Sequence, residues 1–161
     1  MEFEIKNRWT GTIIFTADLD ARYENDPHSI QLGAAIRAAV KAGANLADAD
    51  LAGANLVGAY LADANLAGAD LAGAKWRHGI VLKRTPIQLY NLDNGWRVTI
   101  LDEHMEIGCE LHSFDEWAAF TDKEIAAMDG RRALNFWRRW KPSLMALCEA
   151  RKETATKQAP E

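Results

Sequence analysis

The chain has 161 residues, a formal net charge of −4 and 48% apolar residues, values typical of a globular protein long enough to bury a sizeable core. No apolar run is long enough to span a membrane, and the N-terminus lacks the pattern of a signal peptide. Its two cysteines, Cys109 and Cys148, lie far apart and indicate no disulfide framework. We therefore expect a reduced, cytoplasmic protein.

Two short strands are expected first, at residues 2–7 and 12–18, around a turn at residues 8–11. A helix is expected over residues 29–42. Ser29 is its predicted N-cap, and the glycine that follows the helix is expected to end it. The apolar stripe of this helix consists of Leu32, Ile36, Ala39 and Val40.

A five-residue period dominates the next segment, residues 44–78, in units such as ANLAD, ADLAG and ANLVG. Alanine begins each unit and leucine takes its third position. The repeated third position is held by Leu46, Leu51, Leu56, Leu61, Leu66, Leu71 and, in a degraded last unit, Trp76. The remaining positions are mostly Asn or Asp, a small residue, and Gly or Asp.

This period excludes a simple helix or strand. On an α-helix, steps of five residues place successive leucines roughly 140° apart, so that they form no stripe. In a straight strand an odd step places alternate leucines on opposite faces. A solenoid that turns a corner every five residues brings leucine and the alanine two positions before it inward at every corner. The polar and glycine positions then suit an exposed, tightly turning backbone.

The A-[N/D]-L-x-x units resemble the pentapeptide-repeat family. The resemblance implies a right-handed quadrilateral β-helix with four repeats per coil, in which Leu46 stacks on Leu66, Leu51 on Leu71, and Leu56 on Trp76. Seven repeats make less than two coils, a stack only about 10 Å tall. Such a short solenoid needs caps at both ends, and the N-terminal helix is expected to cover its first coil.

The segment after the repeat reads as short strands followed by helices. Strands are expected at residues 80–82, 87–92, 96–101 and 105–111, with a hairpin turn at Asp93-Asn94-Gly95. Two capping boxes, Ser113 with Glu116 and Thr121 with Glu124, each predict the start of a short helix. A longer helix is expected from about Arg131, and Pro142 should kink it or begin another.

These elements give a mainly β fold with α-helices, arranged along one compact unit. We expect an N-terminal hairpin and capping helix at 1–43, the repeat β-helix at 44–78, a C-terminal α/β cap at 79–150 and a flexible tail at 151–161. The wider layout, including EFEIKNRWTG, LGAAIRAAVKAGANL and TILDEHMEIGCELHSFDEWAAF, resembles small pentapeptide-repeat proteins of phages and prophages. That resemblance implies an accessory phage protein acting in the bacterial cytoplasm.

Residues 131–161 carry eight basic and three acidic side chains, and aromatic residues alternate with the first of them. Arginines beside aromatic rings can bind phosphate and stack on bases. The candidate ligand-binding residues are Arg131, Arg132, Arg138, Arg139, Trp137 and Trp140. The alternative is an amphipathic helix with solvated arginines and a buried stripe of Leu134, Trp137, Leu144 and Leu147.

His104, Cys109 and His112 are of zinc-ligand types, but we predict no metal site. In one continuous strand Cys109 points inward with the apolar residues and both histidines point outward, about 26 Å apart. Cys109 is therefore expected to be a small buried thiol, although a nucleophile with a histidine base remains an alternative. The sequence has no phosphate-binding glycine loop and no hydrolase or metalloprotease motif, so we expect no enzyme and no cofactor.

Some pentapeptide-repeat proteins inhibit DNA gyrase with a long acidic rod that resembles duplex DNA. Here the outward acids are only Asp48, Asp50, Asp63 and Asp70, and the stack covers roughly three base-pair rises. Gyrase inhibition and binding of duplex DNA are therefore disfavoured.

Two classes of binding function remain. The first is a non-enzymatic module that inhibits or sequesters a host defence protein through exposed repeat positions such as Tyr60 and Asp63, together with the basic helix. The second is a sponge for a small phosphorylated ligand, such as a nucleotide immune signal, held by the basic and aromatic residues. The short stack and the six tryptophans also predict a homo-oligomer.

Overall fold

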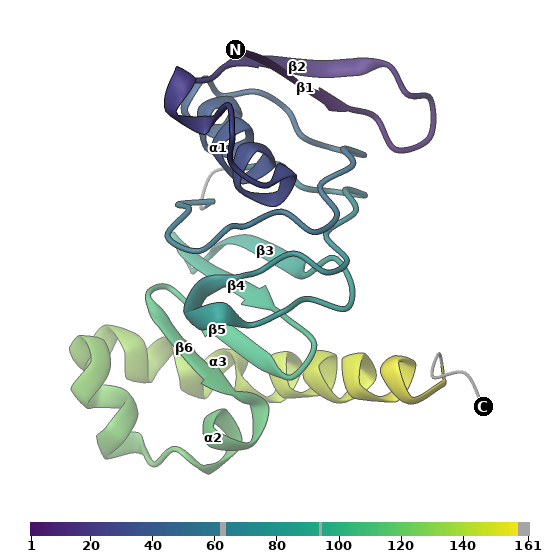
Figure 1. Ribbon diagram of the computed structural model, residues 1–161. Coiled ribbons are helices and arrows are strands. Elements are labelled where there is room, and N and C mark those ends of the chain that lie inside the picture. Colours follow the sequence, from purple (N-terminus) through teal and green to yellow (C-terminus); the bar gives the residue numbers. More distant parts are fainter. Residues whose placement is uncertain (62–63, 94, 158–161) are drawn as a thin grey trace. The chain divides into compact units, whose positions relative to one another are not determined.

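The computed structural model describes residues 1–61, 64–93 and 95–157 (Figure 1). The chain divides into two compact units, Met1–Thr85 and Pro86–Glu161. The first unit holds the hairpin, the first helix and the repeat, and the second holds a four-stranded sheet with two helices. No helix in the described part of the chain is long and apolar enough to cross a membrane.

The N-terminal hairpin consists of β1 (Glu2–Lys6) and β2 (Ile13–Asp18), which pair antiparallel as predicted. The end of β1 continues directly onto the repeat. Arg8 donates its backbone N–H to the carbonyl of Asp48 at 2.9 Å, and Asp50 donates to the carbonyl of Lys6 at 2.8 Å. The hairpin therefore supplies backbone partners for the first turn of the repeat.

Helix α1 (His28–Lys41) is the predicted N-terminal helix, but it begins one residue earlier than expected. Pro27 is its N-cap and makes no side-chain capping bond, so the prediction that Ser29 caps the helix is wrong. Proline has no backbone N–H that would need a partner, and the Pro27 carbonyl accepts from the backbone N–H groups of Ile30 at 2.9 Å and Gln31 at 3.2 Å, so the helix can start there. At the other end Gly43, with φ of +70°, ends the helix as predicted.

Helix α1 packs closely on the repeat. A Cβ on Gly33 would overlap the carbonyl oxygen of Asn55 and lie 3.0 Å from its carbonyl carbon. Asn55 also donates its backbone N–H to the carbonyl of Ser29 at 2.8 Å. Leu32 and Ile36, on the predicted stripe, are buried. The helix thus covers one end of the repeat, as a capping element must.

The repeat returns to the same side every 20 residues, which is four units. Parallel bridges join Asp50 to Asp70 and Asn55 to Lys75. Leu51 donates its N–H to the carbonyl of Asp70 at 2.9 Å, in the register that places it beside the next leucine, Leu71. All seven predicted core positions are buried: Leu46, Leu51, Leu56, Leu61, Leu66, Leu71 and Trp76.

The described repeat units turn their corners in a left-handed conformation at the fifth position. This position is Asp48, Gly53, Gly58, Gly68, Gly73 or, in the degraded last unit, His78, with φ between 55° and 74°. Glycine adopts this conformation without strain, and aspartate is among the few other residues that visit it. A Cβ on Gly68 would also overlap the Asp48 carboxylate one coil away. The glycine and aspartate of the period are therefore turn residues.

In five of the units the second position supports the same corner with its side chain. The Oδ1 atom of Asn45 accepts from the backbone N–H two residues later at 3.0 Å, and Asp70 does the same at 3.0 Å. Equivalent bonds are made by Asp50, Asn55 and Asn65. These are Asx turns, which explain why five units carry a short side chain with an oxygen acceptor at this position.

The chain leaves the repeat through residues 80–85, which do not form the predicted strand. Val81 makes only an isolated antiparallel bridge with Lys75, while the buried Leu82 donates to the carbonyl of Ala74 at 2.9 Å. Thr85 donates its hydroxyl to the carbonyl of Ala69. These bonds use backbone groups on the last turn of the repeat, so the segment serves as its second cap.

The second unit contains a sheet in the order β3-β4-β5-β6, all antiparallel (Figure 1). Its strands are β3 (Ile87–Leu92), β4 (Trp96–Ile100), β5 (His104–Ile107) and β6 (Glu110–Ser113). The first two agree with prediction, although Asn94 in their turn lies outside the described residues. The single strand expected at 105–111 is wrong, because the chain reverses at Gly108 with φ of +61°.

Two helices follow the sheet, α2 (Phe114–Ala119) and α3 (Asp122–Lys157). Both predicted capping boxes are present: Ser113 exchanges hydrogen bonds with Glu116, and Thr121 with Glu124. The predicted longer helix from about Arg131 is confirmed, because the dihedral angles of α3 are non-helical at the two preceding residues, Asp129 and Gly130.

The rest of α3 differs from expectation. The helix runs on through Pro142, so the non-helical break lies before it and not at the proline. It also continues to Lys157, where the sequence suggested a flexible tail from residue 151. A buried ion pair explains the continuation, since Arg151 Nη2 lies 3.4 Å from Asp102 Oδ1 and both side chains are 9% exposed. Polar composition alone did not reveal this partner.

Candidate functional site

The basic segment of α3 was the first predicted ligand site, and much of it is engaged within the second unit. Arg138 binds Asp122 through Nη2 at 2.5 Å and Nε at 3.2 Å. The hydrogen bond from Arg138 lowers the pKa of the Asp122 carboxyl, and the same bond raises the pKa of Arg138. This arginine therefore ties the main part of α3 to the start of the helix.

Asp93 holds the next pair of side chains. Arg139 Nη1 lies 3.0 Å from Oδ1 of Asp93, and Trp140 donates Nε1–H to Oδ2 at 2.8 Å. Both carboxylate oxygens are used, and the guanidinium lies 5.9 Å from the centre of the Trp140 ring. This arrangement joins α3 to the turn after β3, and any anion there would compete with the Asp93 carboxylate.

The remaining residues of the predicted set occupy different surroundings. Trp137 is 3% exposed and Leu144 is 1% exposed, which confirms the part of the amphipathic alternative that places them in the core. Leu147, expected beside them, is 36% exposed. Arg131 is exposed, and Arg132 lies with its guanidinium 4.9 Å from the Trp96 ring centre. The six candidates therefore do not converge on one cavity.

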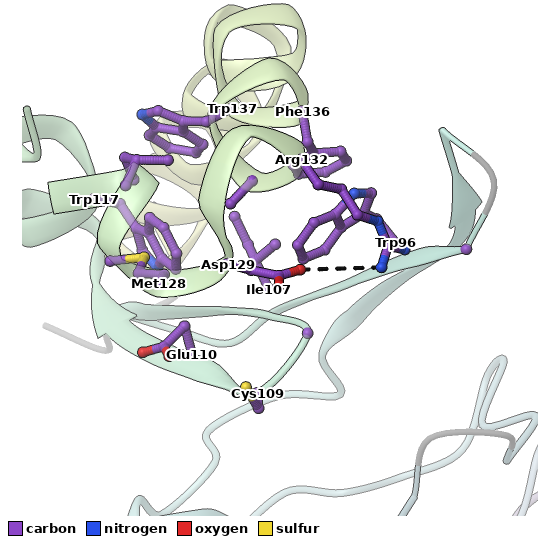
Figure 2. Close-up of a pocket in the computed structure, with 14 residues that line it drawn as sticks. Trp96, Ile107, Cys109, Glu110, Trp117, Met128, Asp129, Arg132, Phe136 and Trp137 are labelled. Carbon is purple, nitrogen blue, oxygen red and sulfur yellow. Dashed lines mark ion pairs between the residues drawn. The ribbon is translucent and has the colours of Figure 1, made fainter. Parts of the chain in front are cut away.

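A pocket of about 390 Å³ opens beside this segment (Figure 2). In Figure 2, Trp117 and Met128 lie on one side of it, and Trp96, Phe136 and Arg132 lie on the other. The hairpin turn between β5 and β6 contributes the polar residues Cys109 and Glu110. Its other lining residues are Gly95, Ile107, Gly108, Ile125, Asp129, Ala133 and Trp137. Sequence reasoning missed this pocket, because its walls come from five separated segments.

The Cys/His cluster is rearranged by the hairpin. Cys109 is exposed at the turn, so the prediction of a buried thiol is wrong. His104 lies at the opposite end of the hairpin, opposite Ser113 in the register, and His112 is opposite Met105. His112 contacts Glu110 at 3.3 Å and makes edge-on contacts with the Trp117 and Phe120 rings.

The expected 26 Å between the two histidines assumed a continuous strand and does not apply to a hairpin. Among the described residues, no three His, Cys, Asp or Glu side chains are grouped so that they could hold a metal ion. The three weak candidate ligands, His104, Cys109 and His112, are therefore not brought together, because Cys109 lies at the turn and His104 at the far end of the strands.

The surface of the first unit carries large exposed side chains. Tyr60 is 72% exposed, whereas Asp63 lies outside the described residues. Trp9, in the turn between β1 and β2, is 73% exposed, and the Arg8 guanidinium lies 4.6 Å from its ring centre. Arg8 also binds Asp70 at 3.2 Å. Trp9 was missed because a tryptophan in a turn has no periodic pattern to mark it.

The pentapeptide-repeat family model matches residues 42–75 in eight copies. Residues 42–75 are therefore pentapeptide repeats, in agreement with the 20-residue return of the backbone in this segment. No curated protein and no solved structure matches the chain. Pentapeptide repeats form a fold that is associated with protein interaction.

Proposed function

We propose that this protein is a non-enzymatic binding protein of phage or prophage type, which inhibits or sequesters a host protein through the surface of its repeat. The repeat would form a short right-handed quadrilateral β-helix, capped by the hairpin with α1 and by the segment after the repeat. The two caps and the 20-residue return support this architecture. The bacterial cytoplasm and a homo-oligomeric state are parts of the same proposal.

The observation that carries the proposal is Tyr60. It takes the second position of its unit, where Asn45, Asp50, Asn55, Asn65 and Asp70 make Asx turns. A tyrosine has no oxygen close enough to its own backbone to make such a turn. At this position the chain therefore presents a large ring that is 72% exposed, in place of the short turn-forming side chain of the other units. Tyrosine is among the residues that most often dominate a protein interface.

Two further exposed side chains belong to the first compact unit, residues 1–85. Val57, close to Tyr60 in the repeat, is 49% exposed, and Trp9 is 73% exposed. An aromatic or aliphatic group on a rigid corner loses little conformational entropy when it binds, which favours affinity. We therefore assign the host-protein contact to the repeat and hairpin surface, with Tyr60 at its centre.

The alternatives receive less support. A nucleotide sponge built on the basic segment would have to displace the carboxylates of Asp122 and Asp93 from Arg138 and Arg139. A DNA mimic would need free outward acids, yet Asp70 is paired with Arg8, and Asp50 accepts from its own turn. An enzyme based on Cys109 lacks a histidine base in its turn.

Tyr60→Asn tests the proposal, because it restores the residue type of the other units. We expect the variant to unfold at the same or a higher temperature, and to lose affinity for the partner by at least tenfold. The partner would be identified by crosslinking in phage-infected host cells, purified, and titrated by calorimetry. Lys41→Gln, at the exposed end of α1, and Arg131→Gln, on the basic segment, serve as controls outside the assigned surface. An unchanged dissociation constant for Tyr60→Asn, together with a loss for Arg131→Gln, would overturn the assignment to the repeat.

A homo-oligomer is tested separately by sedimentation at micromolar concentration. A species of twice the 17.9 kDa chain mass or more is expected. A monomer alone under these conditions would overturn this part of the proposal while leaving the partner contact intact.

A further inference from the structure

The pocket of the second unit is built between two turns of the backbone. One turn is the β5–β6 reversal at Gly108 to Glu110, and the other is the break of α3 at Asp129 and Gly130. Neither turn takes part in the repeat, and the pocket lies within one compact unit. It is therefore a feature independent of the function proposed for the first unit.

The aromatic walls of the pocket are fixed in place before anything binds. Trp117 donates Nε1–H to the carbonyl of Met105 at 2.6 Å, and its ring contacts His112 and Phe120 edge-on at 5.2 and 5.5 Å. Trp96 lies 4.9 Å from the ring of Phe136. A preformed apolar wall saves the ordering cost that would otherwise weaken binding.

Gly108 adds to this preorganisation. A Cβ at this position would lie 3.3 Å from the Trp96 ring, closer than most such contacts, so a larger residue would require the ring to shift. The turn and the ring together close one end of the pocket. The hollow is thus a consequence of the fold at several positions and not of one displaced side chain.

The charges at the pocket favour a cation. Two carboxylates, Glu110 and Asp129, line it together with one guanidinium, Arg132. Arg132 is already committed, because it lies 4.0 Å from Asp129 and 4.9 Å from the centre of the Trp96 ring (Figure 2). Glu110, which also contacts Nε2 of His112 at 3.3 Å, contributes the remaining carboxylate. A phosphate or carboxylate ligand would meet this charge unfavourably, whereas an ammonium group would pair with it.

The size and the walls define the rest of the ligand. About 390 Å³ corresponds to roughly thirteen water molecules at about 30 Å³ each, and it lies within the range of small-molecule sites. Isoleucine, methionine and tryptophan side chains line it, and such surfaces pack well against a flat apolar body. We propose that this pocket binds a small organic cation with an aromatic body, an arylalkylamine in its simplest form, with its ammonium at Glu110.

Cys109 provides a reporter of occupancy, because it lines the pocket and is exposed. The second thiol, Cys148, is buried, and burial raises its pKa to about 12, so that it stays unreactive at pH 8. Alkylation by iodoacetamide, followed by intact mass, therefore reads Cys109 with Cys148 as an internal control. Calorimetry measures the same binding without covalent modification of the protein.

The matched probes are 1-naphthylmethylamine and 1-naphthoate, which share a ring and differ in the sign of the charge. We expect the amine to slow alkylation of Cys109 at least fivefold in a saturable manner, and to bind at least tenfold more tightly than the carboxylate. Glu110→Gln should remove this preference for the amine, while Glu153→Gln, an exposed glutamate elsewhere on α3, should leave it unchanged. Folding of each variant is checked by its unfolding temperature.

Absence of binding by either probe at millimolar concentration would overturn the pocket as a site. Equal binding of the two probes, or an amine preference that survives Glu110→Gln, would overturn the assignment of a cation to Glu110. Because the partner assay for Tyr60→Asn does not involve this pocket, failure here and failure of the proposed function remain distinguishable.

Discussion

Gly33 in α1 lies directly against the backbone carbonyl of Asn55 in the repeat, with no space for a side chain between them. We predict that Gly33→Ala destabilises the protein strongly, by about 2 kcal/mol or more. The added methyl meets backbone atoms that cannot rotate away, and the alternative is to lift α1 off the repeat. The free energy of unfolding by urea measures the effect.

Gly11→Ala is the matched control, because Gly11 has φ of +70° and no atom within 4 Å of the new Cβ. It should cost only the left-handed strain, about 1–2 kcal/mol. Equal or smaller destabilisation by Gly33→Ala would contradict the close approach of α1 to Asn55.

Leu66 tests the register of the repeat. Its side chain is 1% exposed, and the backbone bonds between residues 46 and 65 place it beside Leu46. Leu66→Ala should destabilise by about 2–5 kcal/mol, because a cavity remains among neighbours that cannot collapse. Val57→Ala, at an exposed position of the repeat, should change stability by no more than about 0.5 kcal/mol. If both variants unfold at the wild-type denaturant concentration, the leucine column is not the core.

The sequence was sufficient for features that depend on a strict local pattern. The leucine period gave the correct register because each corner repeats the same chemistry, and both capping boxes were recognisable from residues three apart. Asn and Asp were recognised only as exposed turn residues, although the structure adds that their side chains make the turn.

Features that depend on a reversal or on distant partners were missed. Alternation from Met105 to Leu111 fits one strand as well as two strands of a hairpin, and the left-handed Gly108 decides between them. The error then placed Cys109 in the core. Arg151 looked like part of a polar tail because its partner, Asp102, is 49 residues away. The pocket was missed for the same reason, because no local sequence pattern indicates which distant segments come together to line it.

Arg138 should control the titration of Asp122. The hydrogen bond from Arg138 holds the pKa of this carboxyl below its ordinary value, so Arg138→Gln should raise that pKa. Because the folded-state pKa is the lower one, the pair stabilises the fold above about pH 4 and loses this contribution as the pH falls through the folded-state pKa. Carboxyl-detected NMR titration measures it directly. Arg131→Gln should leave the Asp122 titration unchanged.

Cys148 should make the protein sensitive to alkali. Burial raises the pKa of its thiol to about 12, whereas an unfolded cysteine titrates near pH 8.5. Its contribution is complete below about pH 8.5 and is lost progressively as the pH rises towards 12, because only the unfolded chain releases the proton readily. In thermal unfolding between pH 8 and 11, Cys148→Ala should lose stability less steeply than the wild type.

Cys109→Ala is the control for this experiment, because Cys109 is exposed. Its dependence on pH should follow the wild type. A Cys148→Ala slope equal to the wild-type slope would show that other groups account for the alkaline loss.

Arg151 and Asp102 form a buried ion pair, which joins the last turns of α3 to the segment that follows β4. Arg151→Ala should destabilise by about 3–5 kcal/mol, because it leaves the Asp102 carboxylate buried without its charged partner. The double variant Arg151→Met with Asp102→Leu should be closer to wild type than either single variant, since no charge then remains buried. Chemical denaturation of the four proteins gives the coupling energy. Lys152→Ala, which removes surface pairs with Asp115 and Glu149, should have little effect. A chain ending at residue 150 that is as stable as the full chain would contradict the pair and restore the interpretation of this segment as a tail.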